Sequence, residues 1–226
     1  MTAPASERVR VRRGPRKGRY DLESVKSVLD AGLVAHVAFA ADGQPYCLPM
    51  LHARVGEEVL IHGSRKSRLI RALADGAPAC LTVTTIRGLV LARSAFEHSA
   101  NYACVIALGS FTLVDEAVAK LAALEAFTEK LVPGRWREVR PPNANELRAT
   151  SVLSMRLDEA SVKARSGPPD DDDSPDAALD VWAGVVPIET RFGAPQPSPG
   201  LSAGTALSPS VASLRATFEA EAVWPH

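Results

Sequence analysis

The sequence contains only three cysteines, and none belongs to a Cys-x-x-Cys pair. Cys47, Cys80 and Cys104 each lie within an apolar, strand-like run, so we expect reduced, buried thiols and not a disulfide framework. No apolar run approaches the roughly 20 residues that cross a bilayer. The basic N-terminus also lacks the hydrophobic segment of a signal peptide. These absences predict a cytoplasmic protein without a membrane segment.

The sequence also has no excess of charge of either sign, because 26 basic residues balance 26 acidic residues. The chain as a whole therefore has no field that attracts polyanions, and any charged partner must be recognised locally. A hydrophobic content of 46% excludes a chain that is disordered throughout. The length of 226 residues favours one well-filled domain with tails.

Several enzyme motifs are absent as well. The chain has no Gly-x-Ser-x-Gly elbow, no Walker A loop and no Gly-x-Gly-x-x-Gly after a strand. Its histidines show no zinc-type spacing, and no metal site is predicted. A site assembled across strands stays open. The five histidines are His36, His52, His62, His98 and His226.

Most of the strand-like runs in the sequence are joined by short turns that are typical of β-hairpins. Asp42-Gly43 joins two strand-like runs and is the strongest short hairpin signal. Turns this short exclude crossover helices, so a doubly wound fold is disfavoured and six or seven antiparallel strands in a small barrel are predicted. Strands are expected at 34–41, 44–52, 58–62, 79–86, 89–95, 102–114 and 152–157, with a turn at Arg87-Gly88, and helices at 22–32, 67–75, 118–131, 143–149 and 211–218.

The stretch from Glu58 to Leu73 runs from a strand through a tight turn into a helix. Gly63 permits the turn, and Arg65, Lys66 and Arg68 crowd positive charge where the helix begins. Backbone N–H groups, Ser64 and Ser67 hydroxyls and these cations predict a phosphate site. A solvated basic turn with an ordinary serine cap explains the same spacing equally well.

Three further features indicate a ligand site. Pro49 places the strand around Leu48-Pro49-Met50 at an edge or bulge, which leaves backbone groups free. His62 precedes the basic turn and lies within reach of any bound phosphate compound, although a structural histidine is the commoner outcome. The polar segment from Arg93 to Tyr102 predicts a cavity wall, with a solvent-exposed corner as its alternative.

Composition divides the chain into four parts. Residues 1–19 form a basic arm without interleaved aromatic residues, so a solvated arm or one laid on a partner subunit is favoured over nucleic-acid binding. Residues 20–166 form the barrel domain. Residues 167–180 contain four consecutive aspartates without calcium-loop spacing and predict a solvated linker. In residues 181–226, the apolar segment 181–188 docks on the core, and a flexible tail follows.

Several segments together resemble one family. They are Gln44 to Met50, His62 to Arg68, Leu91 to Tyr102, Val132 to Trp136 and Val181 to Val185. In this order they are similar to the pyridoxamine 5′-phosphate oxidase-like, FMN-binding split-barrel proteins. Within these, the flavin-nucleotide-binding group that includes nitroimidazole-resistance reductases is most similar. The resemblance covers roughly residues 8 to 190.

That resemblance implies a mainly β, six-stranded antiparallel split barrel with a few peripheral helices, and a homodimer with FMN in clefts shared between subunits. It implies backbone at Leu48, Pro49, Met50 and Leu51 facing the flavin ring. It also implies that the FMN phosphate lies at Ser64, Arg65, Lys66 and Arg68. The other subunit is expected to supply part of the pocket from Asn101, Tyr102 and its 181–188 segment. The remaining implied cofactor-binding residues are His62 and Gly63.

The function implied is an FMN-dependent oxidoreductase acting on a small aromatic or nitro compound, with His62 or His98 closest to the substrate. Related barrels include non-catalytic flavin binders, deazaflavin-dependent reductases and haem-binding proteins, for which His62 or His98 is the candidate axial ligand. Pyridoxamine-phosphate oxidases carry an Arg-x-His pair near the C-terminus. The tail here has Arg191-Phe-Gly, which argues against that activity.

Overall fold

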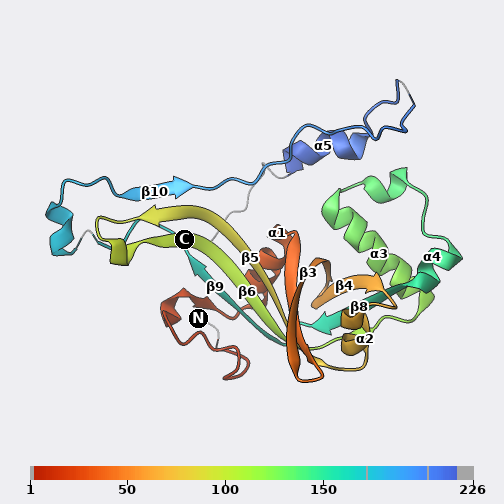
Figure 1. Ribbon diagram of the computed structural model, residues 1–226, viewed down its shortest axis with the longest axis horizontal. Coiled ribbons are helices and arrows are strands. Elements are labelled where there is room, and N and C mark those ends of the chain that lie inside the picture. The colour runs from red at the N-terminus through yellow and green to blue at the C-terminus, as the bar shows by residue number, and fades with distance from the viewer. Residues whose placement is uncertain (1–2, 172, 203, 218–226) are drawn as a thin grey trace.

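The computed structural model describes residues 3–171, 173–202 and 204–217, and antiparallel sheet dominates it (Figure 1). The strands follow the order β1-β9-β6-β5-β2-β3-β4-β8-β7, with β10 added to β5, and the sheet is not closed. The strands are β1 (Gly18–Arg19), β2 (Val34–Ala41), β3 (Gln44–Val55), β4 (Glu58–Ser64), β5 (Pro78–Leu91), β6 (Ser99–Ser110), β7 (Thr112–Leu113), β8 (Thr150–Arg156), β9 (Glu159–Arg165) and β10 (Gly184–Pro187). The helices are α1 (Leu22–Ala31), α2 (Arg68–Ala74), α3 (Ala117–Leu131), α4 (Ala144–Ala149) and α5 (Pro209–Thr217).

The predicted hairpin at Asp42-Gly43 is confirmed. Both residues have positive φ, 53° and 76°, as a tight two-residue hairpin turn requires. The turn sets an uninterrupted register between β2 and β3, from Ala41 opposite Gln44 to Val34 opposite Leu51. The strand around Pro49 therefore contains no bulge.

The main core lies between the inner faces of the two halves of the sheet. Val37, Leu81 and Val105 come from one half, and Ile61 and Leu153 come from the other. Helix α1 fills one end of this core with Val25, Val28 and Leu29. Its N-cap, Asp21, accepts a hydrogen bond from the backbone N–H of Ser24 at 2.8 Å, so the predicted start of this helix is confirmed.

A second, smaller core lies between α3 and the outer face of β3, β4 and β8. Ala123 and Phe127 of α3 pack there against Leu60 and Val152, with Ala53 beside them. Because neighbouring residues of a strand point to opposite faces, His62 lies on the same side of β4 as Leu60. The second core therefore extends to His62.

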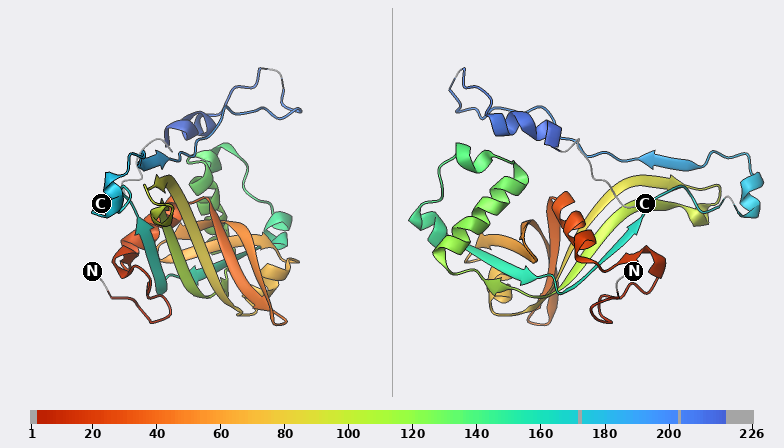
Figure 2. Two further views of the ribbon diagram at one scale, coloured as in Figure 1. Left: turned by 60° about the vertical axis from the view of Figure 1, so that its left-hand side comes forward. Right: turned by 180° about the vertical axis from the view of Figure 1, so that it is seen from behind.

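The turn predicted at Arg87-Gly88 is wrong. Strand β5 continues to Leu91 with only a register shift between Ile86 and Gly88, so β5 and β6 form a long arm that projects from the barrel (Figures 1 and 2). A side-chain carbon at Gly88 would lie 2.8 Å from Val185 Cγ1 and 3.0 Å from Val186 O. The glycine is needed for the close approach of β10, which pairs with the projecting part of β5. Docking of segment 181–188 on the core stays a prediction.

Other parts of the chain also differ from the sequence-based expectations. Asp171 is fully buried and binds Arg93, so the acidic segment is not solvated throughout. The N-terminal arm buries Val9 and pairs with β9 through Gly18 and Arg19. Cys47 is exposed and the other two cysteines are half-buried, contrary to the expected burial. Strand β9 was not predicted.

Candidate functional site

Strands β3 and β4 separate in the middle of the sheet. They pair only from His52 opposite Ile61 to Val55 opposite Glu58. Before His52, β3 continues beside β2 alone, and after Ile61, β4 continues beside β8 alone. In an antiparallel pair every second residue directs its N–H and C=O away from the partner strand. Leu48, Pro49, Met50 and Leu51 therefore lie on a strand edge that no described strand covers, as the edge position of Pro49 predicts.

The basic turn follows directly from the separated end of β4. Ser64, Arg65, Lys66 and Arg68 are all exposed, and α2 begins at Arg68 with Ser67 as its N-cap. The turn uses its own backbone donors: Arg65 N–H donates to Ala149 O, and Lys66 N–H donates to Ser64 Oγ. Ser67 makes no side-chain cap hydrogen bond at the start of α2, and the contribution of backbone N–H groups to an anion site stays a prediction.

Two contacts join this turn to the open edge of β3. The guanidinium carbon of Arg68 lies 4.8 Å from the ring centroid of Tyr46, within the range of a cation–π contact. Gly63 lies beside Met50, whose Cε would be 3.9 Å from a side-chain carbon at that glycine. The structure therefore brings the predicted residues of β3 and of the turn together at the separation of β3 and β4.

His62 lies at the same separation but faces α3. Its ring contacts that of Phe127 edge-on, with centroids 4.4 Å apart. Burial lowers the pKa of His62, so the imidazole is neutral at pH 7. Its Nδ1 is buried and has no hydrogen-bond partner among the described residues. A neutral, oriented imidazole of this kind is suited to binding a metal centre or a polar ligand group.

The other predicted residues lie elsewhere. His98 is exposed at the tip of the arm, where its Nδ1 bonds to Ser94 O at 2.9 Å. Asn101 accepts a hydrogen bond from Arg165 and donates to Gly167 O. Tyr102 pairs with Ile86 in the arm. Because the arm and α2 lie at opposite ends of the molecule (Figure 1), one chain does not bring these residues to the basic turn.

The polar segment of the arm has a structural role. The backbone N–H and guanidinium of Arg93 both donate to Asp171, at 2.6 and 3.0 Å. Arg165 donates to Asn101, Gly167 O and Pro168 O. Arg93 and Asn101 therefore hold the acidic segment against the arm.

One polar cluster near the separated strands was missed in the sequence. His52 is 1% exposed, and its Nε2 lies 2.9 Å from Leu29 O and 2.8 Å from Lys130 Nζ. Burial, and then the charge of Lys130, lower the pKa of His52 to about 4. Burial lowers the pKa of Lys130 to about 8. The two residues are 78 positions apart, so no local pattern reveals the pair.

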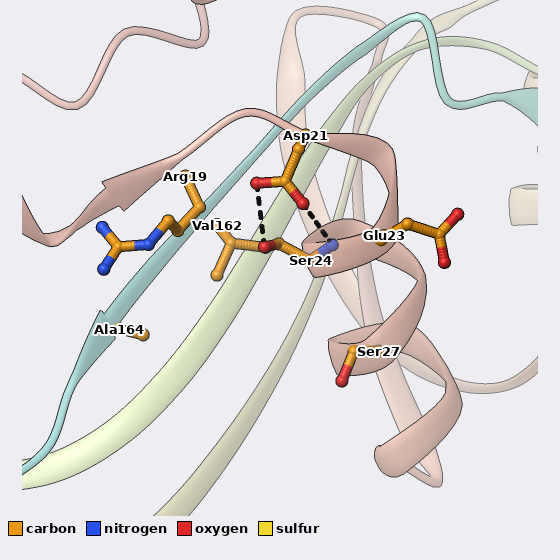
Figure 3. Close-up of a pocket in the computed structure, with 7 residues that line it drawn as sticks. All are labelled: Arg19, Asp21, Glu23, Ser24, Ser27, Val162 and Ala164. Carbon is orange, nitrogen blue, oxygen red and sulfur yellow. Dashed lines mark hydrogen bonds between the residues drawn. The ribbon is translucent and has the colours of Figure 1, made fainter. Parts of the chain in front are cut away.

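A cavity of about 280 Å³ lies between the start of α1 and β9 (Figure 3). The Asp21 carboxylate at its edge already accepts from the N–H and hydroxyl of Ser24. The cavity contains none of the predicted site residues, and we assign it no role. Its lining residues are Arg19, Asp21, Glu23, Ser24, Ser27, Val162 and Ala164.

Within the described ranges, no three His, Cys, Asp or Glu side chains are grouped closely enough to bind a metal ion. In the same ranges, no helix is long and apolar enough to cross a membrane. The site at the separated strands is therefore defined by cations, an open strand edge and an imidazole.

Comparison with solved structures identifies two relatives that match almost the whole chain. The flavocytochrome Anf3 from Azotobacter vinelandii is 38% identical with a TM-score of 0.88, and the match covers 94% of this chain and 98% of that one. An FAD- and haem-binding protein from Mycobacterium smegmatis is 42% identical with a TM-score of 0.84, covering 88% and 97%.

A more distant match shares the fold alone. A protein assigned to 5-nitroimidazole antibiotic resistance from Bacteroides thetaiotaomicron is 16% identical with a TM-score of 0.54, and the match covers 65% of this chain and 85% of that one. No curated protein matches the sequence. The family model described as pyridoxamine 5′-phosphate oxidase matches residues 21–164. The chain therefore belongs to the pyridoxamine 5′-phosphate oxidase-like family of flavin-binding split-barrel proteins.

Proposed function

We propose that the protein is a flavin-dependent oxidoreductase that transfers electrons or hydride to or from a small aromatic or nitro-type compound. The observation that carries this proposal is the open edge of β3 beside the exposed cations of the turn. The turn suits the phosphate of a flavin nucleotide, and the edge offers backbone groups to the polar rim of a flavin ring. When bound, the flavin supplies the redox chemistry.

The protein's own residues supply binding and orientation. Arg65, Lys66 and Arg68 provide positive charge for a phosphate dianion. Tyr46 holds Arg68 beside β3, and Met50 fills the space next to Gly63. These residues act on the phosphate and ring that FMN and FAD share.

The family resemblance favours FMN, whereas the two relatives that match almost the whole chain are described with FAD or as a flavocytochrome. The absorption spectrum of the purified protein, followed by heat release and chromatography of the flavin, distinguishes the two nucleotides. A flavin spectrum and reoxidation of the reduced protein by a nitroaromatic compound are expected. Flavin binding without turnover across a broad panel would support a non-catalytic flavin binder.

Haem binding is a second candidate function, favoured by the neutral, half-buried His62. Both full-length relatives are described as binding haem or as flavocytochromes. His62 and His98 are the candidate iron ligands. Metal-bound histidines usually bond through their second ring nitrogen to a carbonyl or carboxylate oxygen. Nδ1 of His98 makes such a bond with Ser94 O, whereas Nδ1 of His62 has no such acceptor among the described residues. Loss of the haem absorption band in only one of the variants His62→Ala and His98→Ala identifies the ligand.

The protein works as a homodimer in this proposal, because the outer face of β2, β3, β5 and β6 is uncharged. These strands lie side by side with no helix in front of them (Figure 2, left). Val34, Leu51, Ile86 and Ile106 are each at least 41% exposed there. A contiguous apolar face of this kind marks an interface. The face contains no Lys, Arg, Asp or Glu and consists of Val34, His36, Ala38, Ala40, Pro45, Cys47, Pro49, Leu51, Cys80, Thr82, Thr84, Ile86, Tyr102, Cys104, Ile106 and Leu108.

The second subunit would bring its Asn101, Tyr102 and segment 181–188 to the flavin site. Light scattering should give twice the chain mass of 24.0 kDa. Ile106→Glu should give monomers and lower flavin affinity. Val118→Glu, at a position 73% exposed on α3 and away from this face, should change neither. A wild-type protein of single-chain mass would contradict the dimer.

A further inference from the structure

The C-terminal end of α3 meets α1 and β3 at one buried carbonyl oxygen. Lys130 Nζ lies 2.8 Å from Leu29 O and 2.8 Å from His52 Nε2. His52 Nε2 itself lies 2.9 Å from the same oxygen. Lys130 of α3 therefore bridges Leu29 O of α1 and His52 of β3.

The contacts restrict where protons can be. While Lys130 is an ammonium it donates to Leu29 O and to His52, so Nε2 of His52 must be unprotonated and its proton must be on Nδ1. That atom is buried and has no partner among the described residues. A second proton on His52 would place two cations 2.8 Å apart in a buried site. Both burial and like charge oppose this state.

The surrounding charges do not remove the conflict. Asp30 of α1 and Arg54 of β3 act on the pair, but they bind each other through two hydrogen bonds of 3.0 and 2.6 Å. On α3, the carboxylate of Glu129 accepts from the N–H groups of Gly134 and Trp136. No described carboxylate lies within ion-pair distance of Lys130.

We propose that His52 is an acid sensor whose protonation releases the C-terminal end of α3 from the barrel. With α3 docked, Lys130 excludes a second positive charge from His52. With α3 undocked, both side chains reach water and both become cations. The undocked form therefore binds more protons, so a falling pH favours it.

The pH range over which α3 should respond follows from the pKa of His52 in the docked and undocked states. The pKa of His52 is about 4 in the docked state, against an ordinary value of 6.5 in water. Between these limits the equilibrium constant for undocking should rise by up to about tenfold for each unit of pH decrease. Phe127, about one turn before Lys130 on α3, covers His62. Undocking would uncover His62 and the separation of β3 and β4. That consequence rests on the proposed function, whereas undocking itself does not.

Hydrogen exchange of the full chain, without added cofactor, tests the proposal. Exchange of α3 amides, corrected for the intrinsic effect of pH, should show the opening constant rising by about 40-fold in total from pH 6.5 to 4.5. Amides of β5 and β6 serve as an internal reference. His52→Gln keeps a donor and an acceptor but does not titrate, so the rise should disappear. Val118→Gln changes an exposed residue of the same helix and should preserve the rise.

An α3 opening constant that does not depend on pH, or that keeps its dependence in His52→Gln, would overturn the proposal. If His52→Gln does not fold, NMR titration of His52 in the wild-type chain gives the same decision, since ring protonation and α3 exchange must change together. Lys130→Met should raise the pKa of His52. A chain that binds no flavin leaves these readouts unaffected, so the two proposals fail separately.

Discussion

A side-chain carbon at Gly63 would lie 3.1 Å from Cγ1 of Ile70, so α2 packs against β4 at a distance that only glycine allows without a shift. Gly63→Ala should therefore displace α2 and lower the free energy of unfolding by about 1–3 kcal/mol. Urea unfolding measures the loss. Gly193→Ala is the control, because its side-chain carbon meets nothing within 4 Å. Equal stability of the two variants would contradict this packing.

The stacking of Arg68 on Tyr46 predicts that flavin binding depends on an aromatic ring at position 46. Tyr46→Leu removes the aromatic face, and flavin affinity should fall about two- to fivefold, the effect of about 0.5–1 kcal/mol at an exposed cation–π contact. Tyr46→Phe retains the ring and should bind as the wild type does. Quenching of flavin fluorescence gives both dissociation constants.

Arg65 and Lys66 of the turn should contribute more to flavin affinity than Tyr46 does. Arg65→Ala combined with Lys66→Ala removes two charged side chains, and flavin affinity should fall at least about tenfold, given about 1.5–3 kcal/mol for a hydrogen bond to a charged group. Arg71→Ala removes a cation from the last turn of α2 and should leave affinity unchanged. An equal loss in both variants would indicate a general effect of charge.

Stability should depend on pH with a sign set by His52. Its pKa is about 4 when folded and 6.5 when unfolded, so the unfolded chain binds more protons between these values. The free energy of unfolding should then increase by about 3 kcal/mol as pH rises from about 4 to 6.5. Lys130, with a pKa of about 8 against 10.5, predicts a second increase above pH 8. Urea midpoints across pH check both, and His52→Gln should flatten the first.

The ion pair between Arg93 and the buried Asp171 should stabilise the projecting arm and β10. Asp171→Ala leaves a half-buried guanidinium without this carboxylate and should cost about 3–5 kcal/mol, with increased hydrogen exchange at the arm and β10. Asp173→Ala alters an exposed carboxylate in the same segment and should have little effect. Unchanged exchange in Asp171→Ala would mean that the pair does not hold the acidic segment.

Local signals were sufficient for the elements that position the site. Asp42-Gly43 fixes a hairpin by its backbone conformation, Asp21 caps α1, and Pro49 lacks the N–H that an interior strand needs. Gly63 followed by crowded cations identifies the turn before α2. These features depend on a few neighbouring residues, so they can be predicted from the sequence.

Contacts between distant segments were not accessible in this way. Gly88 was expected to make a turn because its real partner, β10, lies almost 100 residues later. The buried Asp171 appeared as one of several solvated aspartates until Arg93 was found beside it. Strand β9 alternates the small residues Ala160 and Ala164 around Val162, a pattern too weakly apolar to identify a strand.

Strand β10 has a consequence for how the chain avoids association. It covers the edge of β5 from Gly88 to Leu91, a stretch that β2 does not reach. A chain shortened before residue 184 would leave that edge unpaired on an apolar strand, which is a template for adding strands from other molecules. Strand β10 thus shields the edge of the projecting β5–β6 arm from such pairing.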